Sequence, residues 1–237
     1  MTLHPVKCGL NFWNTDALFY SPAANAFETG KSKSGVKMMD IMLNLLIFGV
    51  TLRLVTCFPR KDGQWQPERL RKAFRFFTCQ SNVLCALACL LTAVFDIAGD
   101  IPEWVWMLKY TGTAAVTVTM LTVFLFLAPV VGRGWVKRLL TGSVSDLFMH
   151  LLTPVAALVS FLVFEKRGMT FFEALAGMIP VILYGILYLY KTQYAAEEKR
   201  WEDFYAFNRN GKLTVSCMGM VTGTFLICMA LMTMQNI

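Results

Sequence analysis

Long apolar runs alternate with short polar connections along most of the chain. The runs cover about 38–58, 74–95, 104–130, 145–164, 171–190 and 213–234. A helix needs ~20 apolar residues to cross the hydrocarbon core of a bilayer, and each run reaches that length. The pattern therefore predicts an all-α polytopic membrane protein, a bundle of about six transmembrane helices. It divides the chain into a polar N-terminal tail over 1–37 and one transmembrane domain over 38–237.

Composition supports this class and excludes others. Hydrophobic residues make up 56% of the 237 residues and charged residues only 16%, whereas soluble domains carry about 25% charged residues. The net charge of +7 comes from Lys and Arg beside the apolar runs, so we expect membrane lipids and no nucleic acid as partners. The tail has no apolar core ahead of a small-residue cleavage site, and we expect no cleavable signal peptide.

Basic residues predict which side of the membrane each loop faces. The loops after the first and third spans and the connection 192–212 carry twelve Lys and Arg residues, among them Arg133, Lys137 and Arg138, whereas the tail and the loop after the fourth span carry six. By the positive-inside rule, the first group of loops is expected to be cytoplasmic and both termini are expected outside. The longest connection, about 192–212, mixes aromatic and charged side chains and is expected to lie at the interface as an amphipathic element or lid.

Polar side chains inside the spans identify the candidate chemistry, because burying them in lipid is costly. Asp146 and His150 are four residues apart and share one helix face, and Thr78 and Asn82 repeat this spacing in the second span. At 1.5 Å per residue, Thr78 and His150 both lie roughly 6–8 Å inside the same membrane boundary. We therefore expect the hydroxyl and the imidazole to meet in one plane.

These residues are the parts of a nucleophilic hydrolase. Thr78 is the expected nucleophile, His150 its general base, and Asp146 the carboxylate that orients the imidazole. Side chains at the same end of the bundle are candidate oxyanion or substrate contacts: Asn82, Gln80, Ser81, Arg53, Tyr184 and Tyr188. No metal and no cofactor is expected, because His4, the second histidine, is in the tail and no CxxC pair or acidic cluster accompanies His150.

Structural interpretations of the same residues stay open. A threonine in a membrane helix commonly bonds the carbonyl four residues back, and Asp146 is close enough to the boundary to be a solvated carboxylate at a helix start. Arg53 is placed to extend its charged end to the interface. Asn82 and Gln80 suit hydrogen bonds that pair helices.

Two stretches carry a resemblance to a known family. Residues 75–82 read RFFTCQSN and residues 146–154 read DLFMHLLTP; together they resemble the two signature helices of the androgen-induced membrane protein family, which includes the androgen-dependent regulator of tissue factor pathway inhibitor. The chain looks closer to the family's bacterial relatives. The resemblance implies a six-helix intramembrane threonine hydrolase of fatty acid esters of hydroxy fatty acids, with Thr78 as nucleophile and His150 as base. It also implies cytosolic termini, opposite to the charge count.

The sequence therefore predicts an intramembrane hydrolase of long-chain lipid esters. One alternative is a non-enzymatic lipid- or ion-handling protein in which Asp146, His150 and Arg53 form a polar pocket. Another is a scaffold whose aromatic loop, with Trp201 and Phe204, binds a partner. A hydrolase needs Thr78 and His150 within hydrogen-bond reach around a blind cavity, whereas a transporter needs a path to both faces. For a scaffold, replacing Trp201 and Phe204 would abolish function and His150→Ala would not.

Overall fold

The computed structural model describes residues 22–57, 60–61, 64–127, 144–208 and 211–237. Within them, six helices are long and apolar enough to cross a membrane: Ser34–Cys57, Phe77–Ala98, Glu103–Leu125, Ser145–Phe164, Phe171–Tyr194 and Leu213–Asn236. They coincide with the six predicted runs, and the predicted all-α polytopic architecture is confirmed. The chain forms two compact units, Met1–Met38 and Met39–Ile237, and the second contains every contact described below.

Several spans combine more than one helical segment. The first two spans lie in α1 (Pro22–Cys57) and α3 (Phe77–Ala98), and the third is α4 (Glu103–Thr122) followed by the π-helix η2 (Val123–Leu127). The fourth comprises α7 (Val144–Leu147), η3 (Phe148–Leu152), α8 (Thr153–Val159) and η4 (Ser160–Phe164). The fifth comprises α9 (Phe171–Leu175), η5 (Ala176–Met178), α10 (Ile179–Leu189) and η6 (Tyr190–Tyr194), and the sixth is α11 (Leu213–Asn236).

Short elements connect the spans. A two-stranded antiparallel ribbon, β1 (Arg60–Lys61) and β2 (Gln64–Trp65), pairs Arg60 with Trp65 and leads into α2 (Pro67–Ala73). A single 3₁₀ turn, η7 (Glu197–Lys199), lies in the connection to α11. The hydrophobic pattern did not predict the ribbon, because two residues per strand leave no alternation to detect. The basic residues Arg133, Lys137 and Arg138 lie outside the described residues.

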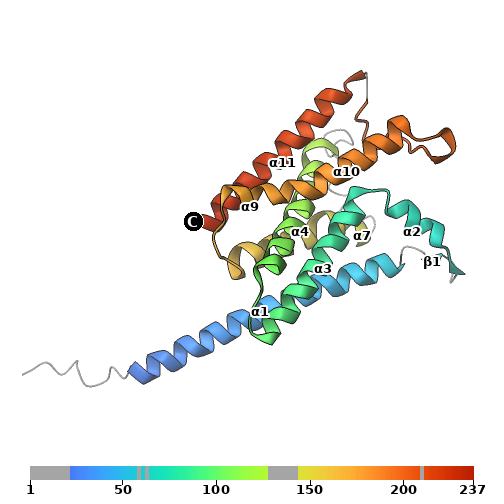
Figure 1. Cartoon of the computed structure of the whole chain (residues 1–237). Helices are drawn as coiled ribbons and strands as arrows, with labels where there is room; N and C mark the ends of the chain where they lie inside the picture. The colour runs from blue at the N-terminus through green and yellow to red at the C-terminus, as the bar shows by residue number, and fades with distance from the viewer. Residues whose placement is uncertain (1–21, 58–59, 62–63, 128–143, 209–210) are drawn as a thin grey trace, which may run out of the picture. The chain divides into compact units, whose positions relative to one another are not determined.

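Helix α4 is the centre of the bundle. It packs against α3, α8, η5 and α11 (Figure 1), and small residues let the neighbours come close. A Cβ added to Gly112 would lie 2.8 Å from the Cα of Cys85 on α3, so only glycine fits at that crossing. The closeness of α3 and α4 fixes where the first turn of α3 lies.

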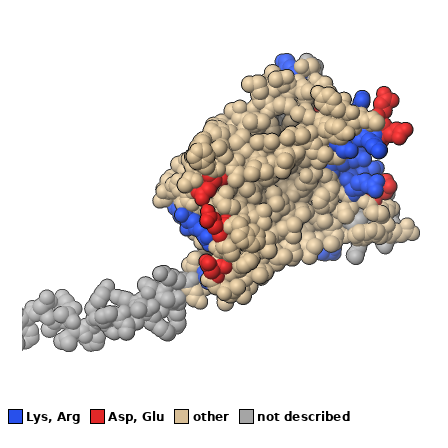
Figure 2. All heavy atoms as spheres, viewed as in Figure 1, with Lys and Arg blue, Asp and Glu red and all other residues tan. Residues whose placement is uncertain are grey.

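The outer surface of the second unit is apolar in the way a bilayer requires. Large hydrophobic side chains on the spans are exposed, for example Leu183 and Ile186 of α10, both 62% exposed. On the face drawn in Figure 2, charged side chains gather towards the two ends of the spans and leave an uncharged band between them. Such a band faces lipid chains in an integral multi-pass membrane protein.

Candidate active site

The structure brings Thr78 and His150 together. Thr78 Oγ1 of α3 lies 3.4 Å from His150 Nε2 of η3, and both side chains are half-buried. The separation is longer than a tight hydrogen bond, which has about 2.8 Å between its heavy atoms. Catalytic hydrogen bonds are often long without substrate and shorten in the complex. Two residues 72 positions apart in the chain are thus placed for proton transfer.

The second nitrogen of His150 has a fixed role. Nδ1 lies 3.0 Å from the backbone carbonyl oxygen of Asp146. A carbonyl only accepts, so Nδ1 carries the proton in the neutral ring and Nε2 presents its lone pair to Thr78. The expected contact to the Asp146 carboxylate is therefore corrected: the backbone of that residue orients the ring, and its side chain is exposed.

Pro154 explains the local shape of the helix that carries His150. The amide of Thr153 donates to the carbonyl of Phe148 five residues back, which makes η3 a π turn. The next amide in that register would donate to Met149, but it belongs to Pro154 and has no N–H. The Met149 carbonyl is left without its intrahelical donor at the residue before His150. Single π turns of this kind are common at functional sites.

Asn82 supplies the missing donor. Its Nδ2 lies 3.1 Å from the Met149 carbonyl oxygen and 2.8 Å from the Thr78 carbonyl oxygen. The amide group therefore ties the turn that holds Thr78 to the turn that holds His150. Both its N–H groups are used, so the helix-pairing interpretation of Asn82 fits the geometry and the oxyanion-donor role does not. Its Oδ1 is buried without a partner among the described residues.

The first turn of α3 is capped from a distant segment. Phe76 precedes the helix in an extended conformation with no side-chain cap. Instead, the amide of Phe77 donates to the hydroxyl of Tyr205, 3.1 Å away, and Gln80 Nε2 donates to the carbonyl of Phe74, 2.8 Å away. The first contact satisfies an N–H group that a helix start leaves open, and the second satisfies a carbonyl at the end of α2. They hold Thr78 at the second helical position and direct the Gln80 amide nitrogen towards Phe74.

The aromatic loop that supplies Tyr205 is fixed by Asp203. The carboxylate of Asp203 accepts from the hydroxyl of Tyr188 at 2.6 Å and from the amides of Phe207 and Asn208 at 2.9 and 2.8 Å. Burial raises the pKa of Asp203, but these three hydrogen bonds outweigh it and hold the pKa below its usual range. Burial also raises the pKa of Tyr205. The loop is therefore an ordered cover.

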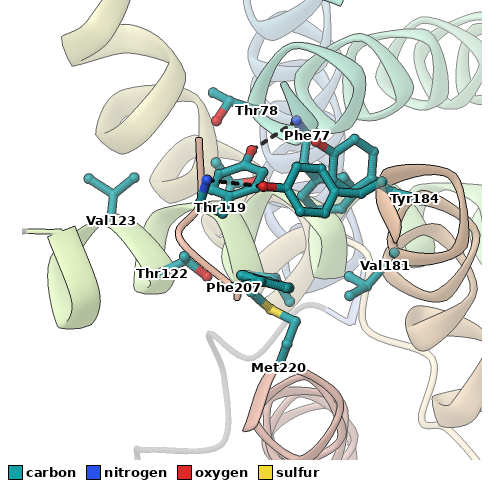
Figure 3. A pocket seen from close by; sticks show the side chains of 13 residues that line it. Phe77, Thr78, Thr119, Thr122, Val123, Val181, Tyr184, Phe207 and Met220 are labelled. Carbon is teal, nitrogen blue, oxygen red and sulfur yellow. Dashed lines mark hydrogen bonds between the residues drawn. The ribbon is translucent and has the colours of Figure 1, made fainter. Parts of the chain in front are cut away.

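An apolar space, the inner cavity, lies beside Thr78 under this loop (Figure 3). It has a volume of about 70 Å³, more than the roughly 10–15 Å³ that one water-sized molecule needs by the same measure. Its lining residues are Phe77, Thr78, Val118, Thr119, Thr122, Val123, Val181, Tyr184, Gly185, Tyr188, Tyr205, Phe207 and Met220. His150 is not among them, so the imidazole reaches the Thr78 hydroxyl from outside the cavity.

A second space, the lateral groove, lies between α3 and α10. It has a volume of about 290 Å³ and is lined by Phe77, Gln80, Ser81, Leu84, Pro180, Leu183, Tyr184 and Leu187. Leu183 and Leu187 are exposed on the lipid-facing surface of α10. Phe77 and Tyr184, whose ring centroids are 5.1 Å apart, line both spaces. This aromatic pair therefore stands between the groove and the cavity.

The remaining side chains that were predicted to contact the oxyanion or the substrate bond to other groups of the protein. Tyr184 donates to the carbonyl of Arg75 at 2.8 Å, and Ser81 Oγ lies 2.9 Å from Thr119 Oγ1. Arg53 is exposed and contacts Cys57 on its own helix, which agrees with the interfacial interpretation. The pocket of Asp146, His150 and Arg53 that the non-enzymatic alternative needs is therefore not assembled by contacts among the described residues.

Sequence reasoning missed a second polar site, at Lys109. This ammonium is 0% exposed and lies 2.9 Å from a carboxylate oxygen of Glu165. The signal was present: Lys109 and Asp40 are ionisable residues inside predicted spans, and such residues are functional candidates by default. Neither Lys109 nor Asp40 lines the inner cavity or the lateral groove.

No protein-family model, curated protein or solved structure matches the chain significantly.

Proposed function

We propose that the chain is an intramembrane hydrolase of lipid carboxylic esters, with Thr78 as nucleophile and His150 as general base. The observation that carries the proposal is the contact of Thr78 Oγ1 with His150 Nε2 at 3.4 Å, while Nδ1 is held by the Asp146 carbonyl. A hydroxyl facing the free lone pair of a neutral imidazole is the arrangement that nucleophilic catalysis requires.

Two half-reactions follow from this geometry. The Thr78 oxygen attacks the ester carbonyl and its proton passes to His150 Nε2; the alcohol then leaves with that proton, and the acyl group stays on Thr78. A water molecule attacks the acyl-enzyme, again giving a proton to Nε2. The carboxylic acid leaves as Thr78 takes this proton back. His150 ends each cycle neutral.

The oxyanion of the tetrahedral intermediate needs a donor near Thr78. The side-chain amides expected in this role are bonded elsewhere, so we assign it to the backbone N–H of Thr78. This amide is in the first turn of α3, where a helix offers no internal acceptor and where the helix dipole favours negative charge. Backbone donors in such positions typically lower the barrier enough for about 10²–10³ in rate.

The two spaces suggest where a lipid ester enters. The lateral groove opens among exposed leucines of α10, and its volume of about 290 Å³ approaches the ~300 Å³ of small ligand sites. The inner cavity is too small for a long chain. We therefore expect the acyl or alcohol chain to enter from the lipid through the groove, with Phe77 moving aside to admit the ester carbonyl to Thr78.

The proposal is tested with purified protein in detergent, a fluorogenic long-chain ester and a fluorophosphonate probe. Thr78→Ala is expected to lose labelling and turnover. His150→Ala is expected to reduce the rate about 10²–10⁴-fold because the general base is removed. Thr78→Ser should retain labelling.

Thr233→Ala is the matched control. Thr233 bonds the carbonyl of Met229 on its own helix at 2.9 Å, so this variant removes a threonine hydroxyl from a membrane helix far along the chain from the pair. Parent-like labelling and turnover by both Thr78→Ala and His150→Ala would exclude the mechanism.

A further inference from the structure

Five polar residues from different parts of the chain form a buried cluster in the second unit. Asp40 and Asn44 are on α1, Lys109 is on α4, Ser160 begins η4, and Glu165 follows η4. None of the five is more than 5% exposed. The cluster takes no part in the proposed hydrolysis. Burying polar and charged groups in an apolar bundle costs free energy, so the presence of the cluster needs a separate explanation.

The ammonium of Lys109 is saturated. It donates to Ser160 Oγ and to Glu165 Oε1, each at 2.9 Å, and to Asn44 Oδ1. An ammonium has three N–H donors, so none is left for a further acceptor. Asn44 Nδ2 also donates to Glu165 Oε1, at 3.0 Å. All three of these hydrogen bonds from the ammonium therefore go to members of the cluster.

Ser160 reveals how many protons the cluster holds. Its Oγ lies 2.8 Å from Asp40 Oδ1 and 2.9 Å from Glu165 Oε1. A hydroxyl has one proton, and Lys109 only donates to it. With both carboxyl groups ionised, one of these two short oxygen–oxygen contacts would have no proton between its atoms. Both contacts are hydrogen bonds only if Asp40 or Glu165 carries a proton.

The charge balance also indicates that the cluster holds one proton. One ammonium and two carboxylates would leave one uncompensated negative charge in a site with almost no solvent contact, which is strongly unfavourable. One proton makes the cluster neutral. Glu165 Oε2 is buried with no hydrogen-bond partner among the described residues, so the cluster has more acceptors than its fixed donors fill. A proton is the ligand that adds a donor without needing space.

We propose that this cluster is a proton-binding site, in which Asp40 and Glu165 share one exchangeable proton through the hydroxyl of Ser160. The site goes beyond the proposed hydrolysis and does not depend on it. Other ionisable groups face it from α3: Asp96 interacts electrostatically with Asp40, and Cys85 and Cys89 with Lys109.

Infrared spectroscopy of the detergent-solubilised full chain tests the proposal. A protonated carboxyl group has a C=O stretching band separate from the bands of ionised carboxylates. At neutral pH we expect such a band in the parent protein, shifted by ¹³C-labelled aspartate or glutamate. Asp40→Asn and Glu165→Gln should each abolish it, since either change removes one negative charge and with it the need for the proton. The exposed Asp100 provides the control, and Asp100→Asn should leave the band unchanged.

Lys109→Gln should change the intensity of the protonated carboxyl band in the opposite direction. Without the ammonium, both carboxyl groups must be protonated for the cluster to be neutral, so the band should grow about two-fold. The proposal is overturned if the labelled parent shows no protonated carboxyl band at neutral pH, a result that needs no variant to fold. It is also overturned if the band survives in Asp40→Asn or in Glu165→Gln, because the proton would then belong to one residue or to another site.

Discussion

The pair of Thr78 and His150 and the cluster around Lys109 are both polar sites in an apolar bundle, but they are satisfied to different degrees. The pair has one contact of 3.4 Å, half-buried side chains and a cavity beside it. The cluster has hydrogen bonds of 2.8–3.0 Å, is nearly unexposed, and lines neither the inner cavity nor the lateral groove.

This is the difference expected between reactive groups and stabilising ones. A nucleophile and a base need a free lone pair and space for a reacting atom, so their hydrogen bonds stay incomplete until substrate arrives. A buried ammonium with two carboxyl groups needs the reverse, because each unmet hydrogen bond costs free energy. We therefore expect substitutions to affect rate at the pair and stability at the cluster.

Removal of the Lys109 charge is the strongest test of this contrast. Breaking a buried ion pair by removing one partner typically costs about 3–5 kcal/mol, so Lys109→Met should lower the free energy of unfolding in detergent by that amount near neutral pH. His150→Ala should lower it by less than about 1 kcal/mol, because the ring is half-buried and makes few contacts. Denaturant unfolding followed by circular dichroism measures both values.

The exposed Lys166 supplies the control. Lys166→Met removes the same charge at the end of a span and should change the unfolding free energy by no more than about 0.5 kcal/mol. Equal losses at Lys109 and His150 would mean that the two sites do not differ in the way proposed.

The sequence predicted the six spans because each is a continuous apolar run of sufficient length. Helical periodicity and depth also predicted that Thr78 and His150 meet, since both depend only on regular helix geometry. The partners of the side chains were not predictable in this way. Asp146 contributes its carbonyl and not its carboxylate, and the π turn η3 that carries His150 leaves no trace in hydrophobic periodicity.

Lys109 shows a different limit. Its position within a span was visible, but the residues that bind its ammonium come from α1 and from the end of the fourth span. Which helices become neighbours depends on close packing, for example at Gly112 against Cys85, and a single sequence does not reveal it. The cap on α3 from Tyr205 has the same origin, because the loop and the helix start are 128 residues apart.

Asn82 and Pro154 allow a sharper test of how Thr78 and His150 are held together. Asn82→Ala leaves the Met149 carbonyl without a donor and should cost about 1–3 kcal/mol. In the Pro154→Ala background, the new amide can serve that carbonyl, so the same change should cost about 1 kcal/mol less. A double-mutant cycle measures this coupling. An equal cost of Asn82→Ala in both backgrounds would disprove the explanation of the π turn.

The cavity beside Thr78 is tested by adding a methyl group. A Cβ on Gly185 meets nothing within 4 Å, and Gly185 lines the inner cavity. Gly185→Ala should therefore fold normally, with a gain of up to about 1 kcal/mol from helix propensity. Lost space in a site is worth about 10-fold or more in rate, so ester turnover should fall by about that factor.

Gly223 of α11 is the matched control for this change. It also has open space at its Cβ position but does not line the cavity, so Gly223→Ala should gain the same helix propensity without the loss of rate. Equal turnover by the two alanine variants would show that the space in the inner cavity is not needed for the reaction.

The smallest expected effect is on the aromatic loop that covers the cavity beside Thr78. The folded pKa of Asp203 is below its unfolded value of about 3.9. The hydrogen bonds of its carboxylate therefore stabilise the loop fully above that unfolded value, and the stabilisation is lost as the pH falls through the lower folded pKa. Limited proteolysis with an acid-active protease should show cleavage in 195–208 rising a few-fold over this acidic window. Asp203→Asn should be cleaved faster than the parent above the window and at a similar rate below it. The exposed neighbour Glu202 lacks these contacts, so Glu202→Gln should follow the parent; an identical response of both variants would assign the pH dependence to net charge and not to the anchor of the loop.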